Sequence, residues 1–231
     1  MPADKGPRPG RRYSTFVGVA FLILIVVATV NTIRTQSGGT LGTSKDERGI
    51  VLPEFAVPNA RTGPLDLDAN IAQDDCSTSE NPCPSDARRT PACRIPREGA
   101  IRVCDLFDRP LVLSFWFTGG ADCLPTQDAV DRVASRYRGR VNFLSIDIRD
   151  DPADVRRIVD ERGWRVPVGY DRDGAVSDLY LVGVCPTVAF TYPGGILAFA
   201  KVGTEELSEP QLADDVQRLL RQSHQRARED R

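Results

Sequence analysis

The longest apolar stretch of the chain lies near its N-terminus. Residues 13–33 are 21 positions without a charged side chain, and they include the apolar stretch 16–28. A helix of this length measures about 30 Å, which is the thickness of the hydrocarbon core of a bilayer. The pattern therefore predicts one transmembrane helix over residues 13–33.

A cleaved signal peptide is the alternative for this segment. No convincing A-x-A cleavage site follows it, and its uncharged length exceeds the apolar region of about 7–15 residues that is usual in signal peptides. Basic residues stand before it at positions 5, 8, 11 and 12, whereas only Arg34 follows it before Lys45. This bias predicts a cytoplasmic N-terminus over residues 1–12. We expect a single-pass protein of the cell membrane whose C-terminal part is extracytoplasmic.

The polar stretches predict how the rest of the chain is divided. Residues 34–49 are rich in glycine, serine and threonine, which is typical of a flexible linker. One domain is predicted over residues 50–222, followed by a charged tail over 223–231. Within the domain, residues 68–99 are polar and contain four prolines and three cysteines. We expect this insertion to be irregular and to need cross-links to hold a shape.

Beyond the insertion, apolar runs alternate with amphipathic segments. Residues 111–117 and 141–148 are nearly all apolar, as expected of strands that are covered on both faces. A helix is predicted after each strand, over residues 124–137 and 152–162, and each ends near a glycine. This order indicates parallel strands that are joined by crossover helices.

The C-terminal part of the domain predicts a hairpin and one more helix. Residues 187–192 and 196–202 are strand-like runs joined by a Pro-Gly-Gly turn. Ser208 stands where an N-cap residue is expected for a helix that runs to residue 220. Together the elements predict an α/β fold, with a mixed sheet that is flanked by helices.

Composition and charge exclude several classes of function. The formal net charge of −2 lacks the positive excess that is typical of nucleic-acid-binding proteins, so no such partner is expected. The only histidine, His224, lies in the charged C-terminal run, which leaves histidine-dependent hydrolases and multi-histidine zinc enzymes without a required residue. No phosphate-binding glycine motif is present. We expect neither a cofactor nor a metal.

The six cysteines are the chemically distinctive residues that remain. All of them follow the apolar segment, and their even number fits an oxidising compartment. Four of them allow three pairings, among which the sequence does not choose: Cys76, Cys83, Cys93 and Cys104. A zinc site is less favoured for these four, because their spacings contain no C-x-x-C pair.

Two stretches of the domain resemble the active-site region of the thioredoxin fold. Residues 110–118 (PLVLSFWFT) are similar to the strand that leads into the active-site turn of that fold. Residues 183–187 (GVCPT) are similar to the loop in which the family keeps a cis-proline beside this turn. Over residues 50–222 the chain resembles the membrane-anchored TlpA-like and the AhpC/TSA-like redoxins. The resemblance implies a thioredoxin-like fold, a cis bond at Pro186, and thiol, disulfide or peroxide chemistry.

The chain departs from the family at the catalytic motif. Where the family carries W-C-x-x-C, residues 119–123 read GGADC, so that Gly120 replaces the first, nucleophilic cysteine. The peroxiredoxin motif P-x-x-x-T-x-x-C does not fit these residues either. A dithiol cycle needs two sulfur atoms, because one thiolate attacks the substrate and the other resolves the mixed disulfide.

Cys185 is the candidate for the second sulfur atom, because in the family the residue before the cis-proline borders the active-site turn. The resemblance implies a redox pair of Cys185 and Cys123, whose position at a helix N-terminus favours the thiolate. The glycines before Cys123 would leave the site open to a thiol or disulfide protein, or to a small peroxide. The expected substrate-binding residues are Gly119, Gly120, Val184 and Pro186.

A structural role is the alternative for Cys123 and Cys185. A disulfide that closes roughly 60 residues stabilises a fold by about 4 kcal/mol on chain-entropy grounds. The chain would then be a non-catalytic binding module with structural disulfides only, which binds a polypeptide at the surface of Gly119 and Pro186. The sequence leaves both hypotheses open, and it does not indicate an oligomeric state.

Overall fold

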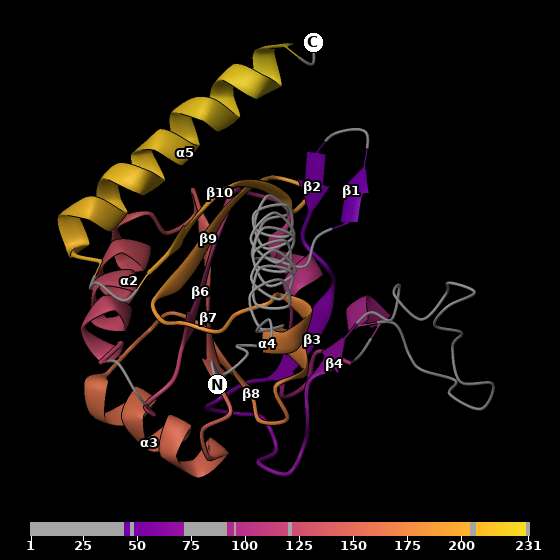
Figure 1. Cartoon of the computed structure of the whole chain (residues 1–231), viewed down its shortest axis with the longest axis vertical. Helices are drawn as coiled ribbons and strands as arrows, with labels where there is room; N and C mark the ends of the chain where they lie inside the picture. The colour runs from indigo at the N-terminus through magenta and orange to yellow at the C-terminus, as the bar shows by residue number, and fades with distance from the viewer. Residues whose placement is uncertain are drawn as a thin grey trace, which may run out of the picture. The chain divides into compact units, whose positions relative to one another are not determined.

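The structure is a computed structural model (Figure 1). It describes residues 44–46, 49–71, 92–94, 96–119, 122–203 and 207–229. The predicted membrane helix, with most of the predicted linker and insertion, lies outside these residues. Among the helices that are described, none has the length and hydropathy to cross a membrane.

A seven-stranded mixed sheet forms the centre of the domain, in the order β1-β2-β10-β9-β6-β7-β8. The strands are β1 Ser44–Asp46, β2 Gly49–Val51, β6 Leu111–Trp116, β7 Asn142–Ile148, β8 Val168–Asp171, β9 Thr187–Tyr192 and β10 Ile196–Val202. The strands β6, β7 and β8 are parallel, whereas β9 is antiparallel to both β6 and β10. Every residue of β6 is buried, as expected of a central strand that is covered on both faces.

Helices cover both faces of this sheet (Figure 1). They are α2 Leu124–Arg136, α3 Pro152–Arg162, α4 Ala175–Leu179 and α5 Glu209–Glu229. Buried residues of α2, α3 and α5 form one apolar cluster with the first face. The helix α4 contributes to a second cluster on the other face, together with strand β3. The domain therefore has two apolar cores, separated by the sheet.

A small antiparallel sheet, in the order β4-β3-β5, belongs to the second face. Its strands are β3 Phe55–Pro58, β4 Asn70–Ile71 and β5 Ala100–Arg102, accompanied by the 3-10 turns η2 Ala92–Arg94 and η3 Val103–Leu106. A disulfide between Cys93 and Cys104 joins the two turns, with Cα atoms 6.0 Å apart. This bond is one of the pairings that the sequence left open, and it ties the end of the insertion to the domain. Cys76 and Cys83 lie outside the described residues.

The ends of α3 and α5 show the local contacts that are typical of helix ends, at the predicted Gly163 and Ser208 and also at Asp151, which was not predicted. The carboxylate of Asp151 accepts a hydrogen bond of 2.8 Å from the N–H of Ala153, which caps α3. The same helix ends at Gly163, whose φ of 64° lies in the left-handed region that glycine adopts readily. Before α5, the side-chain oxygen of Gln211 accepts hydrogen bonds from the N–H and the hydroxyl group of Ser208.

Two predicted boundaries differ from the structure. Helix α5 continues to Glu229, so residues 223–229 are not a separate tail. No glycine or proline interrupts this segment, and its arginine, glutamine and alanine residues favour a helix. Within the predicted linker, residues 44–46 form β1 and Gly49 begins β2. The local composition does not favour strands here. They form because β2 makes hydrogen bonds with both β1 and β10.

The sequence pattern does not reveal the shortest elements. Besides β1 and β2, the missed strands and helix are β3, β4, β5, β8 and α4, which contain two to five residues each. Segments of this length are too short to show a helical or alternating period. The expected architecture is nevertheless confirmed: the domain has a thioredoxin-like α/β fold, and the Cys185–Pro186 peptide bond is cis.

Candidate functional site

Cys123 and Cys185 form a disulfide, with their Cα atoms 6.0 Å apart and a sequence separation of 62. Cys123 is the N-cap residue of α2, in the connection that follows β6. Cys185 precedes Pro186 and the start of β9. Because β6 and β9 are antiparallel neighbours, the end of one and the start of the other meet at the same edge of the sheet. The topology thereby joins two cysteines that are remote in sequence.

Both cysteines of this disulfide are buried. Cys123 is 1% exposed and Cys185 is 2% exposed. They belong to the apolar cluster that α2, α3 and α5 form with the sheet, which also contains Trp116. A thiol of another protein therefore reaches these sulfur atoms only when the loops around them move.

A cavity of about 420 Å³ opens at this edge of the sheet. Gly119 lines it from the loop after β6, and Gly183 lines it from the segment before Cys185. Both glycines are exposed, and a Cβ atom added at either one would meet no atom within 4 Å. The cavity thus adjoins the two loops that carry the disulfide. Because these glycines have no side chains, they do not narrow its opening.

The other predicted binding residues occupy different environments. Val184 is 37% exposed, in the same segment as Gly183. Pro186 is buried. Gly120 lies outside the described residues. Gly119, Gly183 and Val184 therefore belong to the surface that a ligand can touch near the disulfide, together with the exposed residues Thr118 and Asp122.

Charged side chains connect the loops around the cavity. The carboxylate of Asp150 accepts hydrogen bonds from the N–H and the hydroxyl group of Thr118, at 2.7 and 2.9 Å. The guanidinium group of Arg149 donates to both carboxylate oxygens of Asp178, at 3.0 and 3.2 Å. These contacts join the loop after β6 to the loop after β7, and the latter to α4. They restrain the loops that would have to move to expose the disulfide.

A buried carboxyl group lies on the same face of the sheet as the disulfide. Asp147 in β7 is the register partner of Trp116 in β6, so the two side chains point to the same face. Asp147 is fully buried. Its Oδ1 atom accepts a hydrogen bond from the N–H of Asp150, and its Oδ2 atom has no hydrogen-bond partner among the described residues. Burial first, and then the nearby Asp150 carboxylate, raises the pKa of Asp147 to about 9. The group is therefore protonated at neutral pH.

Sequence reasoning did not single out Asp147, although the sequence contains a signal for it. The residue interrupts NFLSIDI, a run of strand residues that is otherwise uncharged. An acidic side chain in such a strand has to be paired or neutral, because a buried unpaired charge is very unfavourable. Arg149 and Asp150 follow directly after the strand, and no motif distinguishes them from other surface residues.

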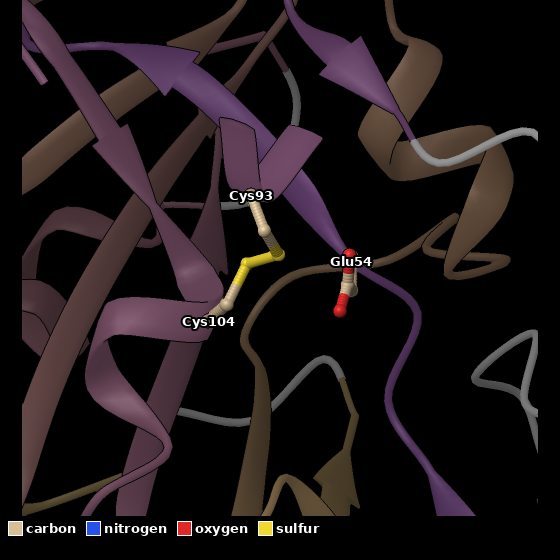
Figure 2. A group of neighbouring side chains, drawn as sticks. All are labelled: Glu54, Cys93 and Cys104. Atoms are coloured by element: carbon tan, nitrogen blue, oxygen red, sulfur yellow. A yellow bond between two sulfur atoms is a disulfide. The ribbon is translucent and has the colours of Figure 1, made fainter. Parts of the chain in front are cut away.

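Glu54 is an acidic neighbour of the Cys93–Cys104 disulfide (Figure 2). A carboxylate oxygen of Glu54 and the two sulfur atoms all lie within 4.8 Å of one another. Zinc and similar metals bind the thiolate form of cysteine, whereas these sulfur atoms are bonded to each other. The group does not suit a metal ion in this state.

Comparisons with known proteins bear on the fold and on the chemistry. No family model matches the chain. The thiol-disulfide oxidoreductase ResA of Oceanobacillus iheyensis is 26% identical over 99 residues, which are 42% of this chain and 52% of that protein. The chain therefore spans about half the length of this relative. The match supports a thioredoxin-like fold of the kind found in disulfide oxidoreductases.

Solved structures add similarities at lower identity. An uncharacterized conserved protein from Geobacillus kaustophilus has a TM-score of 0.51 at 17% identity, over 78% of this chain and 82% of that one. This likeness shows the fold alone. A secreted disulfide oxidoreductase of Mycobacterium tuberculosis, homologous to E. coli DsbE, has a TM-score of 0.47 at 24% identity, over 52% of this chain and 88% of that one.

Proposed function

We propose that the chain is a membrane-anchored, extracytoplasmic thiol-disulfide oxidoreductase whose redox centre is the Cys123–Cys185 disulfide. One observation carries the proposal: the disulfide joins the N-cap of α2 to the residue before Pro186, at the sheet edge where a cavity opens. The ResA relative supports the same class of reaction. The substrate class is a protein that carries a thiol pair or a disulfide.

The oxidising half of the cycle takes two thiol-disulfide exchanges. A substrate thiolate attacks one sulfur atom of the disulfide, whose S–S bond breaks while a mixed disulfide forms. The other cysteine leaves as a thiolate and takes up a proton. The second substrate thiolate then attacks the mixed disulfide and releases the substrate as a disulfide. The substrate loses two electrons, which remain in the thiols of Cys123 and Cys185. The reverse sequence reduces a substrate disulfide.

The position of Cys123 makes it the better leaving group of the pair. It stands at the N-terminus of α2, a helix of 13 residues, where the helix dipole stabilises a negative charge. A substrate thiolate would accordingly attack Cys185, whose neighbours Gly183 and Val184 are exposed. The mixed disulfide would then form on Cys185, two residues after Gly183, which lines the cavity.

The proposed location rests on the sequence. The uncharged segment 13–33 is the proposed anchor, with residues 1–12 in the cytoplasm. Both disulfides of the described residues suit an oxidising compartment. In this arrangement the substrates are extracytoplasmic proteins, and the membrane holds the domain near them.

A non-catalytic binding module is the second candidate, and the burial of both cysteines favours it. In this case the disulfide fastens the start of β9 to α2 and takes no part in exchange. The exposed surface of Gly119 and Val184 would then bind a polypeptide without chemistry.

The reduction potential of the Cys123–Cys185 bond separates the two candidates. We would equilibrate the full-length protein with thiol buffers of graded potential and measure the oxidised fraction by differential alkylation and mass mapping. A working couple has a potential of about −120 to −270 mV, whereas a structural bond lies below about −300 mV. Insulin reduction and peroxide consumption measured on the same protein show which substrate turns over.

Matched variants show which of the two described disulfides carries any measured activity. Cys123→Ser and Cys185→Ser should each abolish turnover. The double substitution Cys93→Ser with Cys104→Ser should retain it, since it removes the other described disulfide. Activity that survives in Cys123→Ser would contradict the proposed redox centre.

A further inference from the structure

A second cavity, of about 350 Å³, lies at the opposite edge of the central sheet. Its lining includes Arg109 just before β6, Asn142 at the start of β7, and Pro167 just before β8. Because β6, β7 and β8 are parallel, their starts share one edge, and the loop that leads to Cys123 leaves from the other edge. This cavity is thus separate from the candidate redox site, and the inference does not depend on the proposed redox chemistry.

Within the described part of the chain, the charged side chains that line this cavity are all arginines. Arg109 precedes β6, Arg138 lies in the turn after α2, and Arg165 lies in the loop before β8. Each of these residues is exposed. The three guanidinium groups around this cavity repel one another. An anion bound between them would be attracted to all three and would offset this repulsion. We propose that this cavity is a binding site for a phosphate group.

The contacts of these arginines leave N–H groups for a ligand. The Nη2 atom of Arg165 donates to the hydroxyl group of Ser135 at 3.0 Å, which uses one of the five N–H donors of the guanidinium group. Arg138 has no hydrogen bond or ion pair with any residue that the structure describes. Arg109 lies 3.4 Å from Asp108, in a pair whose side chains are 46% and 58% exposed. Such exposed pairs contribute little to stability, so a phosphate can compete with this carboxylate.

Two acidic groups near the cavity, Asp108 and Asp131, already accept hydrogen bonds from residues that line it. The carboxylate of Asp108 also accepts a hydrogen bond of 2.7 Å from the side chain of Asn142. Asp131 accepts the backbone N–H groups of Arg165 and Val166, at 2.5 and 2.8 Å. Neither acid belongs to the lining of the cavity. The lining therefore presents positive charge, with hydroxyl and amide groups beside it.

Phosphate is the anion that this chemistry favours. A guanidinium group binds two oxygens of a phosphate or of a carboxylate at once through parallel N–H donors. A phosphate group has further oxygens for the other two arginines, which a carboxylate lacks. Apolar residues complete the wall, among them Leu106, Ala134 and Phe143. They leave space for an uncharged group attached to the phosphate. Two sources share this chemistry: the phosphodiester of a lipid headgroup, and a soluble phosphate ester.

Arginine footprinting tests the site directly. Full-length protein in neutral detergent would be modified with phenylglyoxal, with and without inorganic phosphate or glycerol 3-phosphate, at constant ionic strength. We expect phosphate to protect Arg109, Arg138 and Arg165 from modification. Arg157, which pairs with Asp154 and Glu161 on α3, serves as the internal control and should react at an unchanged rate.

A single substitution provides the second readout. Arg138→Gln should raise the phosphate concentration for half-protection of Arg109 and Arg165 by about tenfold, since it removes one charged hydrogen-bonding partner. Arg157→Gln should leave this concentration unchanged. The proposal is overturned by equal protection in the parent and Arg138→Gln proteins, or by absence of protection by every phosphate compound and lipid.

Lipid nanodiscs distinguish the two sources. Protein in discs of phosphatidylcholine would be compared with protein in discs that also contain phosphatidylglycerol, whose exposed phosphate carries an uncompensated charge. Protection in phosphatidylglycerol discs, without protection by soluble phosphates, identifies a lipid headgroup as the ligand. Protection by glycerol 3-phosphate in detergent identifies a soluble phosphate ester.

Discussion

Asp147 and Trp116 are register partners on β7 and β6, and both side chains lie on the sheet face that carries the Cys123–Cys185 disulfide. Two polar atoms are buried there without a hydrogen-bond partner among the described residues, Oδ2 of Asp147 and the indole Nε1 of Trp116. A carboxyl group in such surroundings stays neutral, because ionisation would leave a negative charge away from water. The acid is therefore a site at which pH acts on the stability of the domain.

The substitution Asp147→Asn should change how stability depends on pH. Because the folded-state pKa is raised to about 9, the folded protein holds a proton that the unfolded chain releases above its ordinary carboxyl pKa. The stabilisation linked to this proton is complete below that ordinary pKa and is lost as pH rises through about 9. Asparagine cannot ionise, so the variant lacks this loss. Relative to the parent protein, its free energy of unfolding should rise with pH by up to about 1.4 kcal/mol per unit between pH 5 and 8.

Denaturant titrations of both proteins at several pH values measure this difference. Asp214→Asn provides the control, because Asp214 is an exposed acid on α5. Parallel pH curves for the parent and Asp147→Asn proteins would show that Asp147 does not change protonation on unfolding.

The two described disulfides should differ in their contribution to stability. Chain-entropy arguments assign about 4 kcal/mol to a bridge over a separation of 62 residues and about 3 kcal/mol to one over 11. Replacing Cys123 and Cys185 together by serine should therefore lower the free energy of unfolding more than replacing Cys93 and Cys104. Urea titration of the two double variants gives the comparison. A larger loss for the shorter bridge would show that loop closure does not dominate.

A second cysteine at the family position should restore a C-x-x-C motif. Gly120→Cys places a sulfur atom three residues before Cys123, and the new pair competes with the Cys123–Cys185 bond. We expect the insulin-reduction rate to rise on the order of tenfold, because an accessible thiolate becomes available for attack. Gly119→Cys is the control. It adds a thiol where the structure has open space, at a spacing that does not form the motif.

Equal rates in the two glycine variants would show that motif spacing is irrelevant. Mass mapping should find the introduced sulfur linked to Cys123 in Gly120→Cys, with Cys185 as a free thiol. Persistence of the Cys123–Cys185 link in every molecule would show that the original bond is preferred.

Asp150 should control access to the disulfide. Its carboxylate accepts two hydrogen bonds from Thr118, in the loop between β6 and α2. Asp150→Ala removes both, with a cost of about 1–3 kcal/mol. The loop should then open more often, and dithiothreitol should reduce the Cys123–Cys185 bond about tenfold faster if about 1.4 kcal/mol of that cost falls on opening.

A graded control accompanies this variant. Thr118→Val keeps the backbone N–H bond and loses only the hydroxyl bond, so its reduction rate should lie between those of the parent and Asp150→Ala. Differential alkylation over time measures all three rates. If the rates are the same, the disulfide is reached by a route that does not involve this loop.

Local patterns of the sequence determined the main elements of the domain. Gly163 ends α3 as predicted, because a helix commonly ends at a residue in the left-handed region, which glycine adopts without a steric penalty. The hairpin of β9 and β10 has the predicted bounds, because its apolar runs and its turn are adjacent in sequence. The strands of β6 and β7 also follow from composition, since a strand covered on both faces needs apolar side chains throughout.

Tertiary structure alone decided the properties that depend on distant residues. The three pairings of the remaining cysteines are equivalent in sequence, and only the packing of η2 against η3 selects Cys93 with Cys104. The sequence placed Cys123 and Cys185 in adjoining turns by resemblance, whereas their burial depends on α5 and on the apolar cluster beneath them. The protonation of Asp147 and the gathering of arginines around the second cavity likewise depend on residues that are distant in sequence. The burial of a side chain and the electric field at its charged group depend on all the residues around it in space. These residues come from segments that no local sequence pattern connects.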